Sequence, residues 1–251
     1  MVKLHRIQIN KDQLKSIPEK ERVFFLKITH LFSETNLLQK MAAFSNNKNI
    51  NYEALRKAQN SQTFLILLIL AGKLFEGSKM IEKDFFKSSL SKEYYDLLSD
   101  EGKESLNYIK EYFGKKNIIK EIRHKFSHHL DSEKIKEAFD CSPADEVFEF
   151  YFSEQYANNF FWLTGNMISY NIMDILDRDD PTKALAKFFD ELLNTAKWFQ
   201  NFIGDYVSVV VGKYWGASEG DTFTIGDAPS LDKVFLPYFV ERRNKTTSSS
   251  G

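Results

Sequence analysis

Three of the five histidines in the sequence lie within a span of six residues, at His124, His128 and His129, directly after Arg123. An imidazole has a pKa of about 6.5, so it can accept or release a proton near neutral pH. A guanidinium can bind a phosphate through two parallel hydrogen bonds. A His/Arg pair can therefore cleave a phosphodiester without a metal, because the histidine transfers a proton while the arginine offsets phosphate charge.

The charge around these histidines differs from that of the whole chain. The formal net charge is −1, which indicates no global surface for nucleic acid. Residues 110–125 nevertheless hold six basic residues against Glu111 and Glu121. The six are Lys110, Lys115, Lys116, Lys120, Arg123 and Lys125. This pattern predicts a local basic surface beside the histidines.

The order of residues from Arg123 to His128 resembles the Arg–polar–…–His motif of HEPN domains. His124 occupies the polar position, and both His128 and His129 have a permitted spacing from the arginine. The resemblance is specific over about seven residues, and the helical layout of residues 16–205 agrees with it. It implies an all-α bundle of long helices with the motif near the end of one of them.

The resemblance further implies a metal-independent endoribonuclease, acting as a toxin or defence effector. The RNA 2′-hydroxyl would attack the adjacent phosphate and leave a cyclic phosphate and a free 5′-hydroxyl. By carry-over, Arg123 stabilises the phosphate and His128 transfers the proton, with His129 as a competitor for that role. RNA is the expected substrate, a homodimer with two motifs in one cleft is the expected assembly, and an antitoxin is a further partner that this context implies.

Helix geometry sets a condition on this site. At about 100° per residue, Arg123 and His128 lie about 140° apart around a regular helix. Either the helix loosens near His128 or a second chain completes the site. The apolar run at 64–71 and the many phenylalanines offer a dimer interface.

Other interpretations of the segment compete with catalysis. A basic helix end is often only a solvated surface, favoured by the negative end of the helix dipole. A non-catalytic HEPN-like module that binds nucleotide, RNA or a protein is the alternative function. His124 and His128 also have the spacing of a two-histidine zinc pair. Lys125, however, stands where a zinc protease needs Glu, so neither a metal nor a cofactor is predicted.

Two further sets of side chains are candidates for a role at a site. Glu76 follows the apolar run, and we expect it to orient Arg123 through an ion pair or, alternatively, to be an ordinary surface residue. Asn158, Asn159 and Trp162 form a polar and aromatic cluster that could stack on a base. An amphipathic core helix would explain this cluster equally well.

The remaining sequence predicts an all-α fold. Glycine and proline are few, and apolar residues recur at helical spacing. Helices are expected at about 16–45, 51–86, 92–98, 101–113, 116–129, 154–176 and 182–206. Residues 1–215 are predicted to form the HEPN-like domain, with its additional C-terminal helices. Residues 216–251 are predicted to be an irregular extension that is disordered at its end.

The location of the protein is inferred from two features. Cys141 is the only cysteine, so an internal disulfide cannot form, which favours a reducing compartment. The apolar run at 64–71 is far shorter than the roughly 18–20 residues that span a bilayer. We therefore expect a cytoplasmic protein without a membrane partner.

Overall fold

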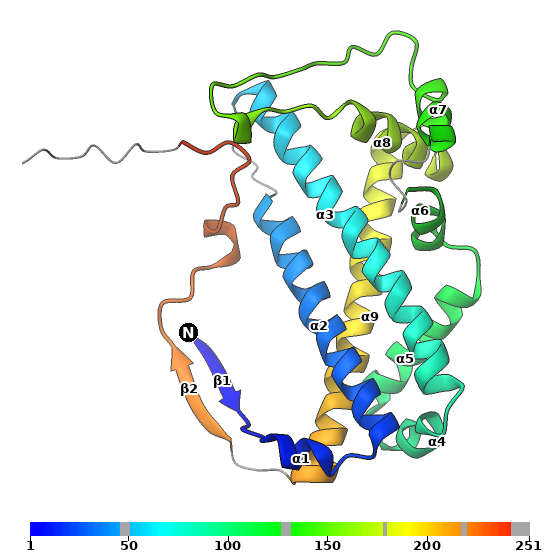
Figure 1. The fold of residues 1–251 in the computed structure, drawn as a ribbon, viewed down its shortest axis with the longest axis vertical. Helices are drawn as coiled ribbons and strands as arrows, with labels where there is room; N and C mark the ends of the chain where they lie inside the picture. Colours follow the sequence, from blue (N-terminus) through cyan, green and yellow to red (C-terminus); the bar gives the residue numbers. More distant parts are fainter. Residues whose placement is uncertain (46–50, 127–131, 178–179, 217–219, 242–251) are drawn as a thin grey trace, which may run out of the picture.

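The computed structural model describes residues 1–45, 51–126, 132–177, 180–216 and 220–241. Within these ranges the chain forms nine α-helices and one two-stranded sheet, which confirms the all-α expectation (Figure 1). The helices are α1 (Lys11–Lys15), α2 (Glu19–Ser45), α3 (Glu53–Met80), α4 (Leu90–Tyr94), α5 (Asp100–Gly114), α6 (Ile118–Phe126), α7 (Ser132–Asp140), α8 (Leu163–Leu176) and α9 (Pro181–Trp215). The strands are β1 (Val2–Arg6) and β2 (Asp221–Ile225).

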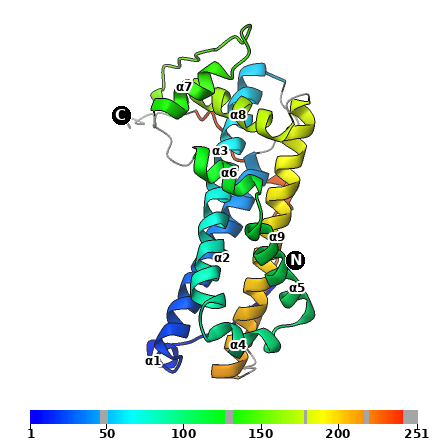
Figure 2. The ribbon, with the colours of Figure 1, turned by 90° about the vertical axis from the view of Figure 1, so that its right-hand side faces the viewer.

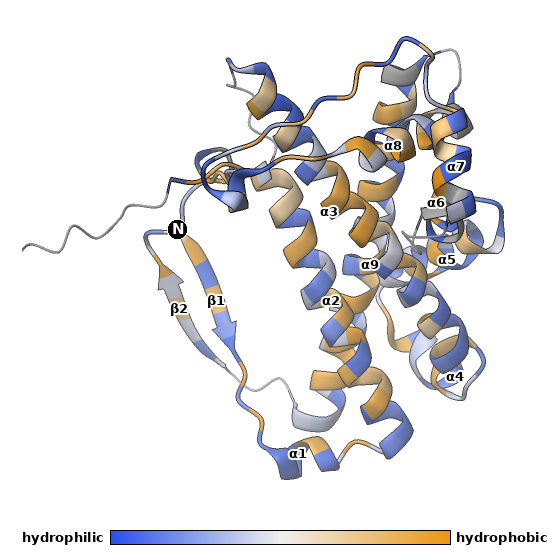
Figure 3. Ribbon diagram, turned by 45° about the horizontal axis from the view of Figure 1, so that its top comes forward, coloured by the Kyte–Doolittle hydropathy of each residue, from blue (hydrophilic) through white to orange (hydrophobic). Residues whose placement is uncertain are grey.

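Three long helices, α2, α3 and α9, run side by side and form the body of the molecule (Figure 1). Figure 2 shows α7 and α8 near one end of these helices, α6 beside their middle, and α1 and α4 at the other end. Hydrophobic residues gather along α3, α8 and α9, in the middle of the molecule (Figure 3). The core therefore lies where the long helices face one another.

Helix α9 supplies one continuous buried stripe of this core. Its members recur every three or four residues, which is the spacing that one face of a helix requires. They are Phe188, Leu192, Ala196, Phe199, Phe202, Ile203, Tyr206 and Val210. The helix begins at the turn that the sequence predicts, because Asp180 caps it and Pro181 takes its first position. It continues nine residues beyond the expected end at Tyr206, as far as Trp215, and Gly216 follows with a positive φ of 71°.

A buried carboxylate joins α2, α4 and α9 at the end of the bundle near α1. Glu21 is 2% exposed and accepts hydrogen bonds from the hydroxyls of Tyr94 and Tyr214. The Lys213 ammonium donates to the Tyr94 hydroxyl at 2.9 Å and lies 3.7 Å from the carboxylate of Glu21. Burial, together with the bond to Glu21, raises the pKa of Tyr94 well above its usual value. The cluster holds a charge in the interior by pairing it on several sides.

The expected helix at 154–176 is wrong over its first part, since α8 begins only at Leu163. Tyr151 and Phe160 instead pair as an antiparallel bridge. The side-chain oxygen of Asn159 accepts a bond from the Ser153 amide, and Asn158 exchanges two hydrogen bonds with the Val240 backbone. The bond of Asn159 to the nearby Ser153 backbone competes with helix formation. Helix α5 is closer to expectation, because it covers Asp100–Gly114 where a helix at 101–113 was expected, and Ser99 caps it.

The region after residue 216 contains regular structure as well as the expected irregular segment. Strand β2 pairs antiparallel with β1, from Val2 opposite Ile225 to Arg6 opposite Asp221. Further along, the Leu236 amide donates to the Phe44 carbonyl at the end of α2. The described part of the extension is therefore tied to the helical body.

The apolar run at 64–71 lies in the middle of α3. Phe64, Ile66, Leu67, Leu70 and Ala71 are buried, whereas Leu65 and Ile69 are 42% and 45% exposed. The run is therefore buried on its inner face and reaches solvent on its outer face. No helix within the described ranges combines the length and the apolar character that crossing a membrane requires.

Two glycines within α3 allow a direct test of its packing. A methyl group at Gly77 would lie 2.5 Å from Leu31 Cδ2 and 2.9 Å from the Phe199 ring, whereas none of the described atoms lies within 4 Å of one at Gly72. Alanine in place of glycine stabilises a helix interior by about 0.5–1 kcal/mol at either position. Overpacking costs about 1–3 kcal/mol at Gly77 alone. Urea unfolding should therefore find Gly77→Ala less stable than Gly72→Ala, and equal stabilities would contradict this packing.

Candidate functional site

Helix α6 carries Arg123 and packs against α3 and α9. Ile118, Ile119 and Ile122 are buried and form its inner face. Arg123 follows Ile122 in the last turn of α6 as far as the helix is described, and its side chain is half-buried. The apolar face therefore fixes the rotation of the helix and leaves Arg123 at the boundary between core and solvent.

Asn117 positions the beginning of α6. Its side-chain oxygen accepts a hydrogen bond of 2.9 Å from the Lys120 amide, which is the N-cap interaction of a helix. Its side-chain nitrogen donates to the carbonyls of Tyr112 and Lys115, at 2.9 and 3.0 Å. Asn117 is only 8% exposed, so these bonds are largely sheltered from water. One side chain thus joins the end of α5 to the start of α6.

Glu191 of α9 meets the same helix start. One of its carboxylate oxygens accepts from the Tyr112 hydroxyl at 2.5 Å and from the Ile118 amide at 3.3 Å. A negative charge is favourable there, because the first amides of a helix carry partial positive charge. Burial and the bond to Glu191 raise the pKa of Tyr112 well above its usual value. Glu191 therefore anchors α6 to the longest helix of the bundle.

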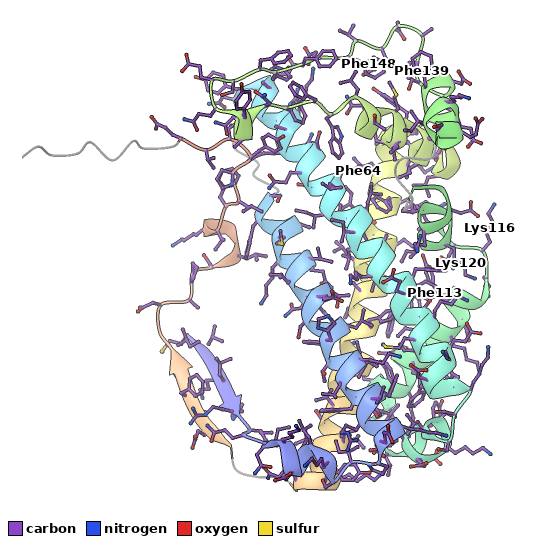
Figure 4. The ribbon with its side chains drawn as sticks, in the orientation of Figure 1. Phe64, Phe113, Lys116, Lys120, Phe139 and Phe148 are labelled. Atoms are coloured by element: carbon purple, nitrogen blue, oxygen red, sulfur yellow. The ribbon has the colours of Figure 1, made fainter. Side chains whose placement is uncertain are left out.

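The lysines ahead of Arg123 have different surroundings. Lys120 donates to the carbonyls of Phe113 and Lys115, at 2.5 and 3.1 Å, so its ammonium closes the end of α5. Lys116 lies 3.7 Å from the carboxylate of Glu121, but its side chain is 83% exposed, so this pair stabilises little. Figure 4 shows Lys116 and Lys120 close to Phe113 at the connection from α5 to α6. Among the lysines of the predicted basic surface whose side chains are described, Lys110, Lys115 and Lys116 are exposed.

The remaining residues of the predicted site are only partly described. His128 and His129 lie outside the described residues, as does the side chain of His124, although its backbone belongs to α6. Glu76 is exposed on α3 and forms no ion pair within the described part of the chain, so the expected pair with Arg123 is not seen there. No group of three His, Cys, Asp or Glu side chains among the described residues is arranged to hold a metal ion.

Asn117 and Glu191 are the positioning residues that the sequence interpretation missed. An asparagine directly before an apolar helical run is a recognisable cap signal, so Asn117 could have been found. Glu191 gives no such signal, because it lies more than 70 residues beyond the helix start that it contacts. Only the packing of α6 on α9 brings the two together.

We expect Asn117→Ala to loosen α6. Loss of the cap should lower the free energy of unfolding by about 0.5–2 kcal/mol. It should also accelerate amide hydrogen exchange in residues 119–122, measured by mass spectrometry. Asn51→Ala, at an exposed asparagine before α3, is the matched control and should change neither quantity. Unchanged exchange in α6 would show that the cap does not hold this helix.

The chain was also compared with known proteins. No family model matches it, no curated protein matches it, and no solved structure matches it. The functional argument consequently depends on the chain's own residues.

Proposed function

We propose that this protein is a metal-independent ribonuclease whose active site is built from Arg123 and the histidines that follow it. The observation that carries the proposal is the position of Arg123, half-buried in the last described turn of a helix held at its start by Asn117 and Glu191. An arginine on a helix that is anchored in this way can present its guanidinium to a phosphate at the edge of the core. Exposed Lys115 and Lys116 lie just ahead of α6 and add positive charge for an RNA backbone.

The reaction follows from the chemistry of these groups. His128 removes the proton from a 2′-hydroxyl, and the oxygen then attacks the adjacent phosphorus. The bond from phosphorus to the 5′-oxygen breaks, and that oxygen takes up a proton. Arg123 offsets the negative charge that develops on the phosphate oxygens. The products are a cyclic phosphate and a free 5′-hydroxyl.

Cleavage of mixed-sequence single-stranded RNA in EDTA tests the proposal. We expect Arg123→Ala and His128→Ala each to lower the rate by about 10²–10⁴-fold, the usual contribution of a proton-transfer group or a charge stabiliser. Arg56→Ala and His30→Ala change exposed residues of the same types elsewhere and should leave the rate unchanged. The rate of His129→Ala, compared with that of His128→Ala, shows which of the two adjacent histidines transfers the proton. An inactive wild-type protein across varied RNAs, or full activity in both site variants, refutes the mechanism.

Mixing the two inactive variants tests whether two chains share the site. If Arg123 of one chain acts with His128 of another, heterodimers of the Arg123→Ala and His128→Ala proteins contain one intact pair. Co-refolding the variants at equal concentration should then restore a measurable fraction of wild-type cleavage, whereas each variant refolded alone stays inactive. No restoration, with heterodimers verified by differently tagged chains, would show that each site is confined to one chain.

A further inference from the structure

A cleft lies between α3, α8 and α9, beside the segment that leads from α7 to α8. It consists of two hollows of about 370 and 290 Å³. Both have Asn60, Trp162 and Asn166 in their walls, so the hollows adjoin. Their combined volume lies within the range of roughly 300–1,000 Å³ that is typical of small-molecule sites.

Trp162 forms a fixed aromatic wall of this cleft. Its indole lies directly over Gly165, in the first turn of α8, and a methyl group on that glycine would overlap the ring. Glycine at this position therefore lets the ring rest on the helix backbone. Phe64 forms part of the opposite side, and Figure 4 shows it projecting from α3. Its ring is itself held against Phe188 of α9, with centroids 6.2 Å apart.

Two side-chain amides supply the uncommitted polar groups of the cleft. Those of Asn60 on α3 and Asn166 on α8 form no hydrogen bond with any described residue, and each offers a donor and an acceptor. The nearby hydroxyls are already engaged, since Ser61 donates to the Lys57 carbonyl and Ser169 to the Asn166 carbonyl. Hydrogen bonding to a ligand is therefore available mainly from the two amides.

Each charged group in the walls of the cleft has a polar or charged partner. Lys57 bonds to Glu149 and lies 3.1 Å from Glu53, and these carboxylates raise its pKa. Glu146 accepts a bond of 2.6 Å from the Tyr170 hydroxyl. Of the charged residues in the walls, Lys57 is positive while Glu146 and Glu149 are negative. The balance disfavours a phosphate and favours an uncharged ligand.

We infer that this cleft binds a nucleobase, stacked on Trp162 with its polar edge on the amides of Asn60 and Asn166. Aromatic side chains stack on the face of any base, and an asparagine amide matches the adjacent donor and acceptor of a base edge. The base can come from a free nucleoside or from an RNA strand. The sequence interpretation placed Trp162 with Asn158 and Asn159, but those asparagines hold backbone, and the partners of Trp162 come from α3 and α8 instead.

Titration calorimetry of the full chain with the four ribonucleosides, and with short oligonucleotides of each base, tests the inference. Free nucleosides contain no phosphodiester bond, so the binding measured with nucleosides is independent of RNA cleavage. We expect Trp162→Leu, Asn60→Ala and Asn166→Ala each to weaken binding by about tenfold, in line with the loss of one stacking or base-edge contact. Trp198→Leu and Asn51→Ala are matched controls, because both residues lie outside the cleft.

Each result decides for or against the site. Binding of nucleosides identifies a free-base site, and binding of oligonucleotides alone identifies a site for a base within a strand. No binding of either probe overturns the inference, as does binding that is unchanged in all three cleft variants. Circular dichroism checks that the variants fold. If Trp162→Leu does not fold, the binding measured with Asn60→Ala decides, because Asn60 is exposed on α3.

Discussion

Two carboxylates on one face of α9 hold the beginnings of the two helices that lead to Arg123. Glu191 accepts from the first amide of α6, and Asp205 accepts at 2.8 Å from the Ser99 amide at the start of α5. At about 100° per residue, the two acidic residues lie about 40° apart around α9. Each places negative charge at the positive end of a neighbouring helix. The register of α5 and α6 along the bundle therefore depends on α9.

The contact between α5 and α9 requires the two helices to approach closely, in addition to the charge of Asp205. A methyl group on Gly102 of α5 would overlap the Asp205 carboxylate, so only glycine leaves room for the contact. Further along the same interface, Tyr108 stacks on Trp198 with ring centroids 4.8 Å apart. Packing and electrostatics thus act on the same pair of helices. Helix α8 links the Arg123 site and the cleft, because Trp162 lies at the start of α8 and α8 also contacts α6.

The sequence predicted the long helices well, because their signals are local. Apolar spacing located α2 and α3, and α9 begins at Pro181, one residue before the expected start. What it missed depends on distant partners. Strand β1 becomes a strand only by pairing with β2, over 200 residues away. The false helix start before Leu163 has one local cause, the bond of Asn159 to the Ser153 amide, and one distant cause, the bonds of Asn158 to the Val240 backbone.

The candidate site shows the same division. The position of Arg123 within a helix followed from the sequence, whereas its support by Glu191 did not. Trp162 was recognisable as an aromatic residue among asparagines, but its partners were misidentified because they come from other helices. Glu76 is exposed on α3, which agrees with its interpretation as a surface residue, and the alternative ion pair with Arg123 is not seen among the described residues.

The late position of α9 in the chain has a consequence for biosynthesis. Synthesis proceeds from the N-terminus, and the apolar faces of α2 and α3 are finished long before the helix that covers them. Phe24, whose ring packs edge-on against Tyr206, lacks that contact until α9 has left the ribosome. The nascent chain therefore presents part of this apolar surface until α9 has been synthesised. During that interval the surface is available to chaperones.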